Sequence, residues 1–284
     1  MVKANSFYAN ETIYFVTKHG KEEILAPLFQ EIGIRCKRIA LDTDQFGTFS
    51  GEVERTGSVR ETLRKKISAA ASGFAEGRLF LSSEGSFSSD SLFGFLQSDL
   101  ESLLLWDREL GTEIYAEYLD RAPVHAEASF GPSDDFHEFL EKIDFPEHAT
   151  MVSPEGQYMP MFKGLKSEHD VAQAMLECFW HSTTGEVVIA TDLRADQNRT
   201  RRVAIRKAGE ALIGKLQSLC PKCSVPGFSI SRGLPGLRCI GCGKPSTVPA
   251  TVLFQCVGCG HKEEKSRPDG ISRLPIEECE YCNP

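Results

Sequence analysis

The chain has 284 residues, 41% of them hydrophobic and 25% charged, which is the composition of an ordinary soluble protein with room for one sizeable core. Its formal net charge of -8 argues against a general binder of polyanions, although a local basic patch is compatible with that value. No apolar run approaches transmembrane length, so a membrane is not an expected partner. The opening residues, MVKANSFYANET, contain no signal-peptide core or cleavage site, and the expected location is the cytoplasm.

The first 219 residues are predicted to form one α/β domain, because short β-branched or aromatic runs alternate with amphipathic stretches. A turn at 107–111 predicts a meander, so we expect a mixed sheet flanked by helices. Ser58 with Glu61, and Ser167 with Asp170, have the spacing of helix start signals. The predicted strands are 12–17, 34–41, 79–83, 100–106, 112–119, 123–130, 148–152 and 186–191, and the predicted helices are 21–32, 59–73, 133–143, 168–182 and 199–218.

The loop at 17–21, between the first predicted strand and the first predicted helix, has the composition of a phosphate-binding loop. Two lysines, a hydroxyl and a glycine at a helix N-terminus suit phosphate oxygens, because free backbone amides, the helix dipole and positive charge act together. The loop lacks the GK[ST] ending of a P-loop, and a solvated connection is the alternative. The candidate phosphate ligands are Thr17, Lys18, His19 and Lys21.

The segment 42–55 gathers four carboxylates among glycine, serine and threonine residues. Hard carboxylate oxygens in such a loop suit Mg²⁺ held against a substrate phosphate, and Arg55 is placed to contact the same anion. The alternative is an acidic surface loop. The carboxylates are Asp42, Asp44, Glu52 and Glu54, of which we assign Asp42 and Asp44 to catalysis.

A third polar cluster follows the predicted strand 79–83 and contains Glu84 and Ser86 on either side of a glycine. A carboxylate at a strand end is well placed to act as a metal ligand or general base, because open α/β sheets bind their ligands at that edge. We therefore predict a catalytic role for Glu84 and a substrate contact for Ser86. Asp99 and Glu101 flank the next strand and are interpreted as its exposed edge.

The segment 191–202, TDLRADQNRTRR, is rich in arginine and opens the last predicted helix. Asp192, Arg194 and Arg201 are candidate contacts to a second anion, since cations at a helix start suit phosphate. The cations from Arg199 to Lys207 are alternatively a site for a nucleic-acid backbone. A solvated basic helix face is the remaining interpretation.

Eight of the ten cysteines form four CxxC pairs within residues 220–284, the spacing of zinc ligands. Spacers of 15 residues (224–238) and 19 residues (260–278) lie within the window for a four-cysteine site, whereas the middle spacer (243–255) has 13. Sequential pairing is therefore predicted, with two tandem zinc ribbons at 220–242 and 256–282. The ligands are Cys220, Cys223, Cys239 and Cys242 in the first site, and Cys256, Cys259, Cys279 and Cys282 in the second.

Two structural zinc ions are the expected cofactors of this tail, because a four-cysteine site leaves no open position for a substrate. Disulfides are the alternative, but a reducing compartment disfavours them. The segment 220–284 has eight Lys/Arg against six Asp/Glu, a net of +2 that zinc-bound thiolates would reverse, so no nucleic-acid footprint is visible there. The composition of this segment is equally compatible with docking of the ribbons to the rest of the chain or to a protein partner.

Several motifs resemble those of an uncharacterised bacterial domain family without an assigned function. They are VTKHGKEEI, DTDQFGTFSGE, LSSEGSF and TDLRADQNRTRR, followed by CPKC and the cysteine-rich tail. The likeness spans most of the chain and implies no activity.

More distantly, residues 13–86 resemble the start of the inosine/xanthosine triphosphate pyrophosphatase superfamily. The likeness rests on Thr17 with Lys21, on the helical segment ETLRKKISAA, and on Glu84 in SSEGSF. It implies Mg²⁺ and carboxylates that direct water at the α/β-phosphate bond of a noncanonical nucleotide. The chain departs from that pattern in the spacing of the first loop, in lacking the paired aspartates of the acidic turn, and in its arginine-rich and cysteine-rich segments.

Two functions follow from these patterns. The first is a Mg²⁺-dependent hydrolase or binder of a phosphorylated, nucleotide-like substrate, in which zinc is structural. The second is a noncatalytic module that binds nucleic acid or protein through the arginine-rich helix and the ribbons.

Overall fold

The structure is a computed structural model, in which residues 7–46, 57–89, 97–157 and 159–284 are described. The chain divides into two compact units. The first unit comprises residues 1–109 and 115–213, and the second comprises residues 110–114 and 214–284. The chain therefore passes between the two units three times.

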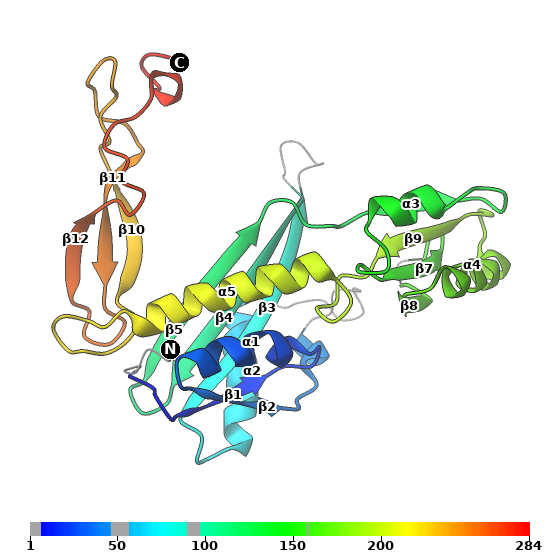
Figure 1. The fold of residues 1–284 in the computed structure, drawn as a ribbon, viewed down its shortest axis with the longest axis horizontal. Coiled ribbons are helices and arrows are strands. Elements are labelled where there is room, and N and C mark those ends of the chain that lie inside the picture. The colour runs from blue at the N-terminus through cyan, green and yellow to red at the C-terminus, as the bar shows by residue number, and fades with distance from the viewer. Residues whose placement is uncertain (1–6, 47–56, 90–96, 158) are drawn as a thin grey trace. The chain divides into compact units, whose positions relative to one another are not determined.

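The first unit contains a five-stranded sheet with the order β2-β1-β3-β4-β5 (Figure 1). β1 runs parallel to both β2 and β3, whereas β4 runs antiparallel to β3, so the predicted mixed sheet is confirmed. Its strands are β1 (Thr12–Val16), β2 (Arg35–Ile39), β3 (Leu79–Ser89), β4 (Gln97–Asp107) and β5 (Thr112–Asp120).

Helices cover both faces of this sheet. On one face α2 (Val59–Gly73) buries Leu63 and Ile67 with Val16 of β1 and Phe80 of β3. On the other face lie α1 (Lys21–Glu31) and α5 (Arg199–Gln217), which pack against each other (Figure 1). A Cβ at Gly209 of α5 would lie 2.5 Å from Leu25 Cδ2 of α1, so glycine permits this close approach.

The start of α2 confirms the predicted capping signal. The Ser58 hydroxyl accepts a hydrogen bond from the Glu61 backbone N–H, and the Glu61 side chain accepts one from the Ser58 N–H at 2.7 Å. The reciprocal bonds satisfy two amides that a helix leaves unpaired at its N-terminus. This helix start was predictable because a capping signal depends only on residues close together in the chain.

Replacing Ser58 by alanine is expected to lower the free energy of unfolding by about 1 kcal/mol, since the N-cap acceptor is lost. Urea denaturation followed by circular dichroism measures the change. The matched control is Ser72→Ala near the other end of α2, where the hydroxyl bonds only the Ala69 carbonyl. Equal losses for both variants would contradict the capping role.

A second sheet within the first unit has four strands in the order β6-β9-β7-β8. Its core contains Val152, Val171, Val187 and Ile189, buried beneath α4. The elements are β6 (Glu127–Phe130), α3 (His137–Lys142), β7 (Thr150–Pro154), β8 (Phe162–Leu165), α4 (Glu168–His181) and β9 (Val187–Thr191). The sequence did not predict β8, whose four residues are all half-buried and carry no alternation of apolar and polar side chains. It also did not predict that β9 belongs to a separate sheet.

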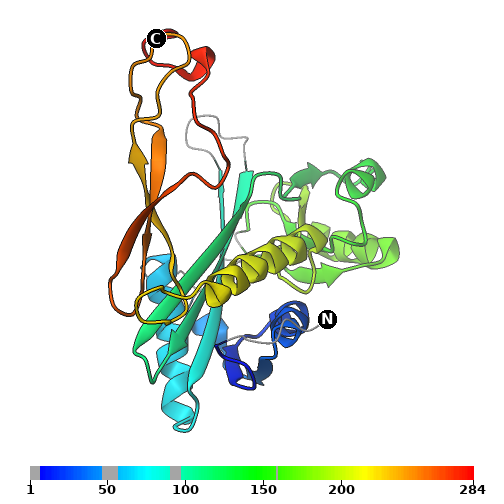
Figure 2. The ribbon, with the colours of Figure 1, turned by 60° about the vertical axis from the view of Figure 1, so that its left-hand side comes forward.

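The second unit contains a three-stranded antiparallel sheet in the order β10-β11-β12, drawn in orange to red-brown in Figure 2. Its strands are β10 (Ser229–Pro235), β11 (Pro249–Gln255) and β12 (Lys262–Ser266). A cysteine pair precedes β10, one follows each of β10 and β11, and the last lies beyond β12. None of the described helices combines the length and apolar composition needed to cross a bilayer.

Candidate functional site

The eight cysteines of the tail form two four-sulfur clusters. The Sγ atoms of each cluster lie within 4.8 Å of one another, and individual separations are 3.8 Å for Cys220 and Cys259 and 3.9 Å for Cys239 and Cys282. Tetrahedral zinc with bonds of about 2.3 Å would hold its sulfurs about 3.8 Å apart, whereas a disulfide needs about 2.0 Å. The sulfur geometry therefore fits two zinc ions.

The clusters combine the pairs in a crossed order, so the predicted sequential pairing is wrong. One cluster contains Cys220, Cys223, Cys256 and Cys259, and the other contains Cys239, Cys242, Cys279 and Cys282. The antiparallel register explains this order, because Ser229 at the start of β10 faces Gln255 at the end of β11. The first and third pairs therefore meet at one end of the sheet, and the second pair lies at the other end. Spacer length alone carries no information on that pairing.

Each of the first three cysteine pairs lies in a tight turn that directs backbone amides at sulfur. The residue after the second cysteine has a positive φ, 70° at Gly243 and 71° at Gly260, and its N–H donates to the carbonyl of the first cysteine. The N–H of Gly241 donates to the sulfur of Cys239 at 3.3 Å. Such bonds stabilise a thiolate over a thiol, which is the form that zinc binds.

The pKa values of two cluster cysteines reflect these bonds. Burial favours the neutral thiol of Cys220, but the backbone N–H groups of Cys223 and Lys222 outweigh it and lower its pKa to about 6. The N–H groups of Cys242 and Gly241 likewise lower the pKa of Cys239 to about 7, against the effect of burial. Each cluster thus has one cysteine whose thiolate forms near neutral pH, whereas the pKa of Cys223 and the pKa of Cys282 are raised to about 12.

The clusters also supply much of the core of the second unit. Cys239 and Cys279 are buried with Leu237 and Leu274, and Cys220 and Cys256 are buried with Phe228. So few apolar side chains cannot stabilise a domain by burial alone. Zinc in these closed sites would therefore act in folding rather than in chemistry.

A second group of chemically active side chains lies inside the first unit, between the five-stranded sheet and its helices. We call it the ion cluster, and it contains Lys21, Lys66, Glu84, Asp99, Glu101 and Arg201, all of them buried. On the face covered by α1 and α5, Glu101 accepts bonds from Lys21 Nζ at 3.1 Å and from Arg201 Nε at 2.6 Å. One carboxylate of β4 thus joins the starts of two helices.

The pKa values of Glu101 and Lys21 are set by opposing effects. Burial raises the pKa of Glu101, but Arg201 and Lys21 outweigh burial and lower it. Burial lowers the pKa of Lys21, while Glu101 opposes the change and Arg201 adds to it. The carboxylate is therefore firmly ionised, whereas the lysine loses its proton more readily than a surface lysine.

On the other face of the sheet, Lys66 of α2 is ion-paired with Glu84 of β3 and also donates to the Ser83 carbonyl at 3.2 Å. Glu84 faces Ser102 in the β3–β4 register, and the neighbouring Gly85 faces Glu101. Alternate strand residues point to opposite faces, so the two ion pairs lie on opposite sides of adjacent strands. Because β3 continues to Ser89, Glu84 lies within the strand and not at its end as predicted.

Asp99 corrects the interpretation of this region as an exposed strand edge. Asp99 is 0% exposed and Glu101 is 1% exposed. Neither carboxylate oxygen of Asp99 has a hydrogen-bond partner among the described residues. Burial, and then the negative charge of Glu101, raise the pKa of Asp99 to about 7. A buried carboxylate without a donor is costly, and it marks this cluster as more than a packing feature.

The structure brings together only some of the predicted phosphate and metal ligands. Lys21, Glu84 and Arg201 belong to the ion cluster, and Glu84 contributes to the electrostatic field at Lys21. Thr17 is buried, His19 and Ser86 are half-buried, and Lys18 is ion-paired with Asp42 at 2.9 Å on the surface. The side chain of Asp44 and the whole of Glu52, Glu54 and Arg55 lie outside the described residues.

The arginine-rich segment divides into two separate environments. Asp192 follows β9 of the four-stranded sheet and is bonded by the fork of Arg194, with Nη2 to Oδ2 at 2.6 Å. Arg201 instead points to Glu101 and also donates to the Leu193 carbonyl. Arg194 and Arg201 therefore each have a carboxylate partner of their own.

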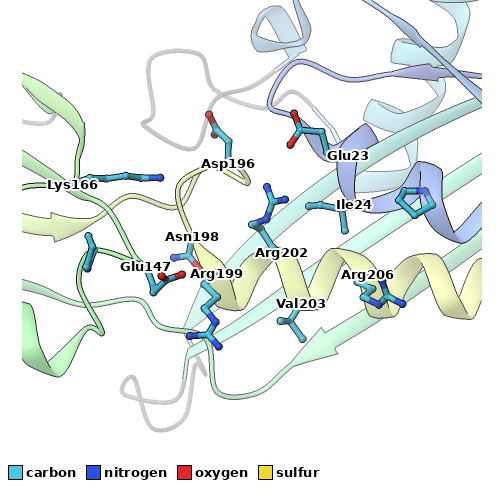
Figure 3. A pocket seen from close by; sticks show the side chains of 12 residues that line it. Glu23, Ile24, Glu147, Lys166, Asp196, Asn198, Arg199, Arg202, Val203 and Arg206 are labelled. Atoms are coloured by element: carbon cyan, nitrogen blue, oxygen red, sulfur yellow. The ribbon is translucent and has the colours of Figure 1, made fainter.

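Three other arginines of this segment line a surface groove (Figure 3). Arg199, Arg202 and Arg206 extend from successive turns of α5, and Glu23 and Ile24 face them from α1. The groove has a volume of about 710 Å³. Four cations and three carboxylates line it, since Lys166, Glu147 and Asp196 also contribute. Its charge is therefore mixed.

Sequence reasoning missed three members of the ion cluster as ligands, namely Lys66, Asp99 and Glu101. The available signal was the i, i+2 spacing of Asp99 and Glu101, which places both carboxylates on one face of a strand that continues into the apolar run 103–106. Lys66 carried a weaker signal, because a lysine on the buried face of a helix interrupts its apolar pattern.

Comparisons with known proteins add a family and no activity. A family model described as a domain of unknown function, DUF6671, matches residues 70–284, a range that contains all eight cluster cysteines and the carboxylates of the ion cluster but neither Lys21 nor Lys66. A crystal structure of protein VC0702 from Vibrio cholerae is similar, with a TM-score of 0.32 and 8% identity, covering 72% of this chain and 93% of that one. No curated protein sequence matches.

Proposed function

We propose that the ion cluster of this chain, which belongs to the DUF6671 family of domains of unknown function, is the active site of a hydrolase. Its substrate would be a phosphorylated, nucleotide-like small molecule, and the bond broken would be a phosphoanhydride. The zinc clusters would stabilise the fold and take no part in the reaction.

The observation that supports this proposal is the burial of three cations and three carboxylates, which come from β3, β4, the starts of α1 and α5, and the middle of α2. Buried ion pairs rarely stabilise a fold better than apolar residues of the same volume would. Six buried ionisable side chains, in two groups on opposite faces of β3 and β4, are therefore better explained by binding and proton transfer than by stability. Lys21 also begins α1, where the helix dipole favours an anion.

The proposed chemistry assigns a task to each kind of side chain. Lys21 and Arg201 on one face of the sheet, and Lys66 on the other, are the cations available to hold phosphate oxygens and offset the charge that develops on them. A carboxylate would take a proton from the attacking water, which forms the new P–O bond as the anhydride P–O bond breaks and the leaving phosphate departs. Glu84 and Asp99 are the candidates for that base, and a pKa of about 7 suits Asp99 to it.

Magnesium remains a prediction from the acidic segment. Among the described residues, no three carboxylates converge as the cysteines do, and Asp42 is engaged with Lys18. We therefore assign no step of the reaction to a metal ion, and the assay below includes Mg²⁺ as a variable.

A panel of canonical and modified nucleoside triphosphates, assayed with and without Mg²⁺ for released phosphate and pyrophosphate, tests the proposal. At least one member is expected to turn over, and Glu84→Gln is expected to reduce the rate by about 100-fold or more, as loss of a general base does. The matched control is Glu76→Gln, an exposed residue after α2, which is expected to leave the rate unchanged. If no nucleotide of the panel is hydrolysed or bound, the proposal is wrong.

The groove beside α5 favours one alternative, a noncatalytic module that binds a nucleic-acid backbone through Arg199, Arg202 and Arg206. Its three carboxylates weaken that case. Salt-dependent binding of an oligonucleotide that Arg202→Ala abolishes and Glu84→Gln leaves intact, without turnover of any nucleotide, would establish the alternative.

A further inference from the structure

A second candidate binding site lies within the zinc-bearing unit, near the cluster of Cys239, Cys242, Cys279 and Cys282. It is a pocket of about 550 Å³, a size that suits a small ligand. Three arginines and no acidic residue line it, together with small residues that leave backbone groups accessible. The charged and small residues are Arg238, Arg267, Arg273, Gly236, Gly270, Ser266 and Ser272.

Two of these arginines are held side by side by backbone pairing. Cys239 and Leu274 form a parallel bridge, in which the Leu274 N–H donates to the Arg238 carbonyl at 3.0 Å and the Ile240 N–H donates to the Leu274 carbonyl at 2.9 Å. The preceding residues, Arg238 and Arg273, are therefore neighbours on adjacent extended segments. Like charges in such positions destabilise a pairing, unless an anion lies between them.

The three arginines differ in how far the protein already uses their donors. The Arg267 side chain is 15% exposed, donates to the Pro249 carbonyl and is paired with Asp269, so it is largely structural. Arg238 donates a hydrogen bond from Nη1 to the Gly243 carbonyl at 3.0 Å. Arg273 makes no hydrogen bond or ion pair with any residue that the structure describes. Most donors of Arg238 and Arg273 thus remain for a ligand.

We propose that this pocket binds a phosphate group, held by the guanidinium forks of Arg238 and Arg273. A planar fork offers two parallel N–H bonds to two phosphate oxygens, and two forks on one anion relieve their mutual repulsion. The proposal does not depend on the ion cluster, which lies in the other unit. The phosphate belongs either to a free small molecule or to a nucleic-acid strand, and both sources present the same oxygens.

The test uses the full-length protein loaded with two zinc ions. Inorganic phosphate, pyrophosphate, a fluorescent mononucleotide and a single-stranded 12-mer are titrated by calorimetry or fluorescence anisotropy. The double variant Arg238→Ala with Arg273→Ala is expected to bind the preferred probe at least 10-fold more weakly, since it loses two charged forks. The matched control is Arg232→Ala on β10, an exposed arginine of the same unit that does not line the pocket.

Three readouts make the outcome decisive. Zinc content must stay at two per chain in the double variant, and if it falls, Arg273→Lys replaces it, because lysine keeps the charge and loses the fork. Binding of the 12-mer that far exceeds the mononucleotide, with a steep dependence on salt, assigns the phosphate to a nucleic acid. Equal affinities assign it to a small molecule. The proposal fails if no probe binds, or if the arginine variants bind as tightly as the parent protein.

Discussion

A variant with serine in place of the first two cysteine pairs is expected to bind no zinc tightly, because each cluster takes one of its two pairs from this set. The substituted residues are Cys220, Cys223, Cys239 and Cys242. Two thiolates cannot form a closed tetrahedral site, and a structural zinc site contributes about 10–16 kcal/mol of binding free energy in small peptides. The metal content of purified protein is measured by inductively coupled plasma mass spectrometry.

The matched control removes the same number of cysteines but takes them from one cluster. Serine at Cys220, Cys223, Cys256 and Cys259 is expected to leave one zinc per chain, since the other four ligands stay intact. Sequential pairing predicts the reverse, with one zinc in the first variant and none in the second. Cobalt substitution, whose visible spectrum counts thiolate ligands, confirms that any retained ion has four sulfurs.

Glu101→Gln is expected to destabilise the first unit by about 3–5 kcal/mol, the usual effect of breaking a buried ion pair from one side. Glu101 is the shared partner of Lys21 and Arg201, and all three are buried, so the variant leaves two cations without their carboxylate. Deprotonation of Lys21 would relieve part of the loss, because burial already lowers its pKa. Guanidinium denaturation with paired fluorescence and circular dichroism measures the change.

Asp99→Asn is the matched control on the same strand, and its effect is expected to have the opposite sign at pH 8. The pKa of Asp99 is about 7 in the folded protein and near its ordinary value of 3.8 when unfolded. The folded state therefore binds more protons between these values, and the parent protein loses stability as the pH rises from about 4 to 7. The asparagine variant lacks this loss. A destabilised Asp99→Asn at pH 8, with an unchanged pH profile, would contradict the assignment.

The elements of this fold were largely predictable where the signal is local. The Ser58–Glu61 and Ser167–Asp170 spacings mark the observed starts of α2 and α4. The predicted apolar stripe of α5 is buried at Ile205, Ala208, Leu212 and Leu216, whereas Leu219, its last predicted member, lies beyond the helix end and is exposed. Capping and helical periodicity depend on residues within a few positions of one another, so both can be predicted directly from the sequence.

The predictions that were wrong concern features that depend on pairing between distant segments of the chain. No local feature of β9 shows that it joins the four-stranded sheet, so Asp192 could not be separated from the strand ends of the other sheet. Glu84 was predicted to lie at a strand end because glycine and serine follow it, whereas pairing with β4 extends β3 to Ser89. The cysteine order failed for the same reason, since the β10–β11 register decides it. The role of a residue that depends on its partner strand cannot be predicted from a single sequence.

The crossed clusters constrain the order in which the second unit is assembled during synthesis. Cys220 and Cys259 are 39 positions apart, and Cys239 and Cys282 are 43 apart, so each metal closes a long loop. Each loop also contains a cysteine pair of the other cluster. A nascent chain that ends before Cys256 therefore carries four of the eight cluster cysteines and no complete site. The first site is complete only once Cys259 is translated and the second only once Cys282 is, and until then these thiolates would be open to oxidation or to a metal chaperone.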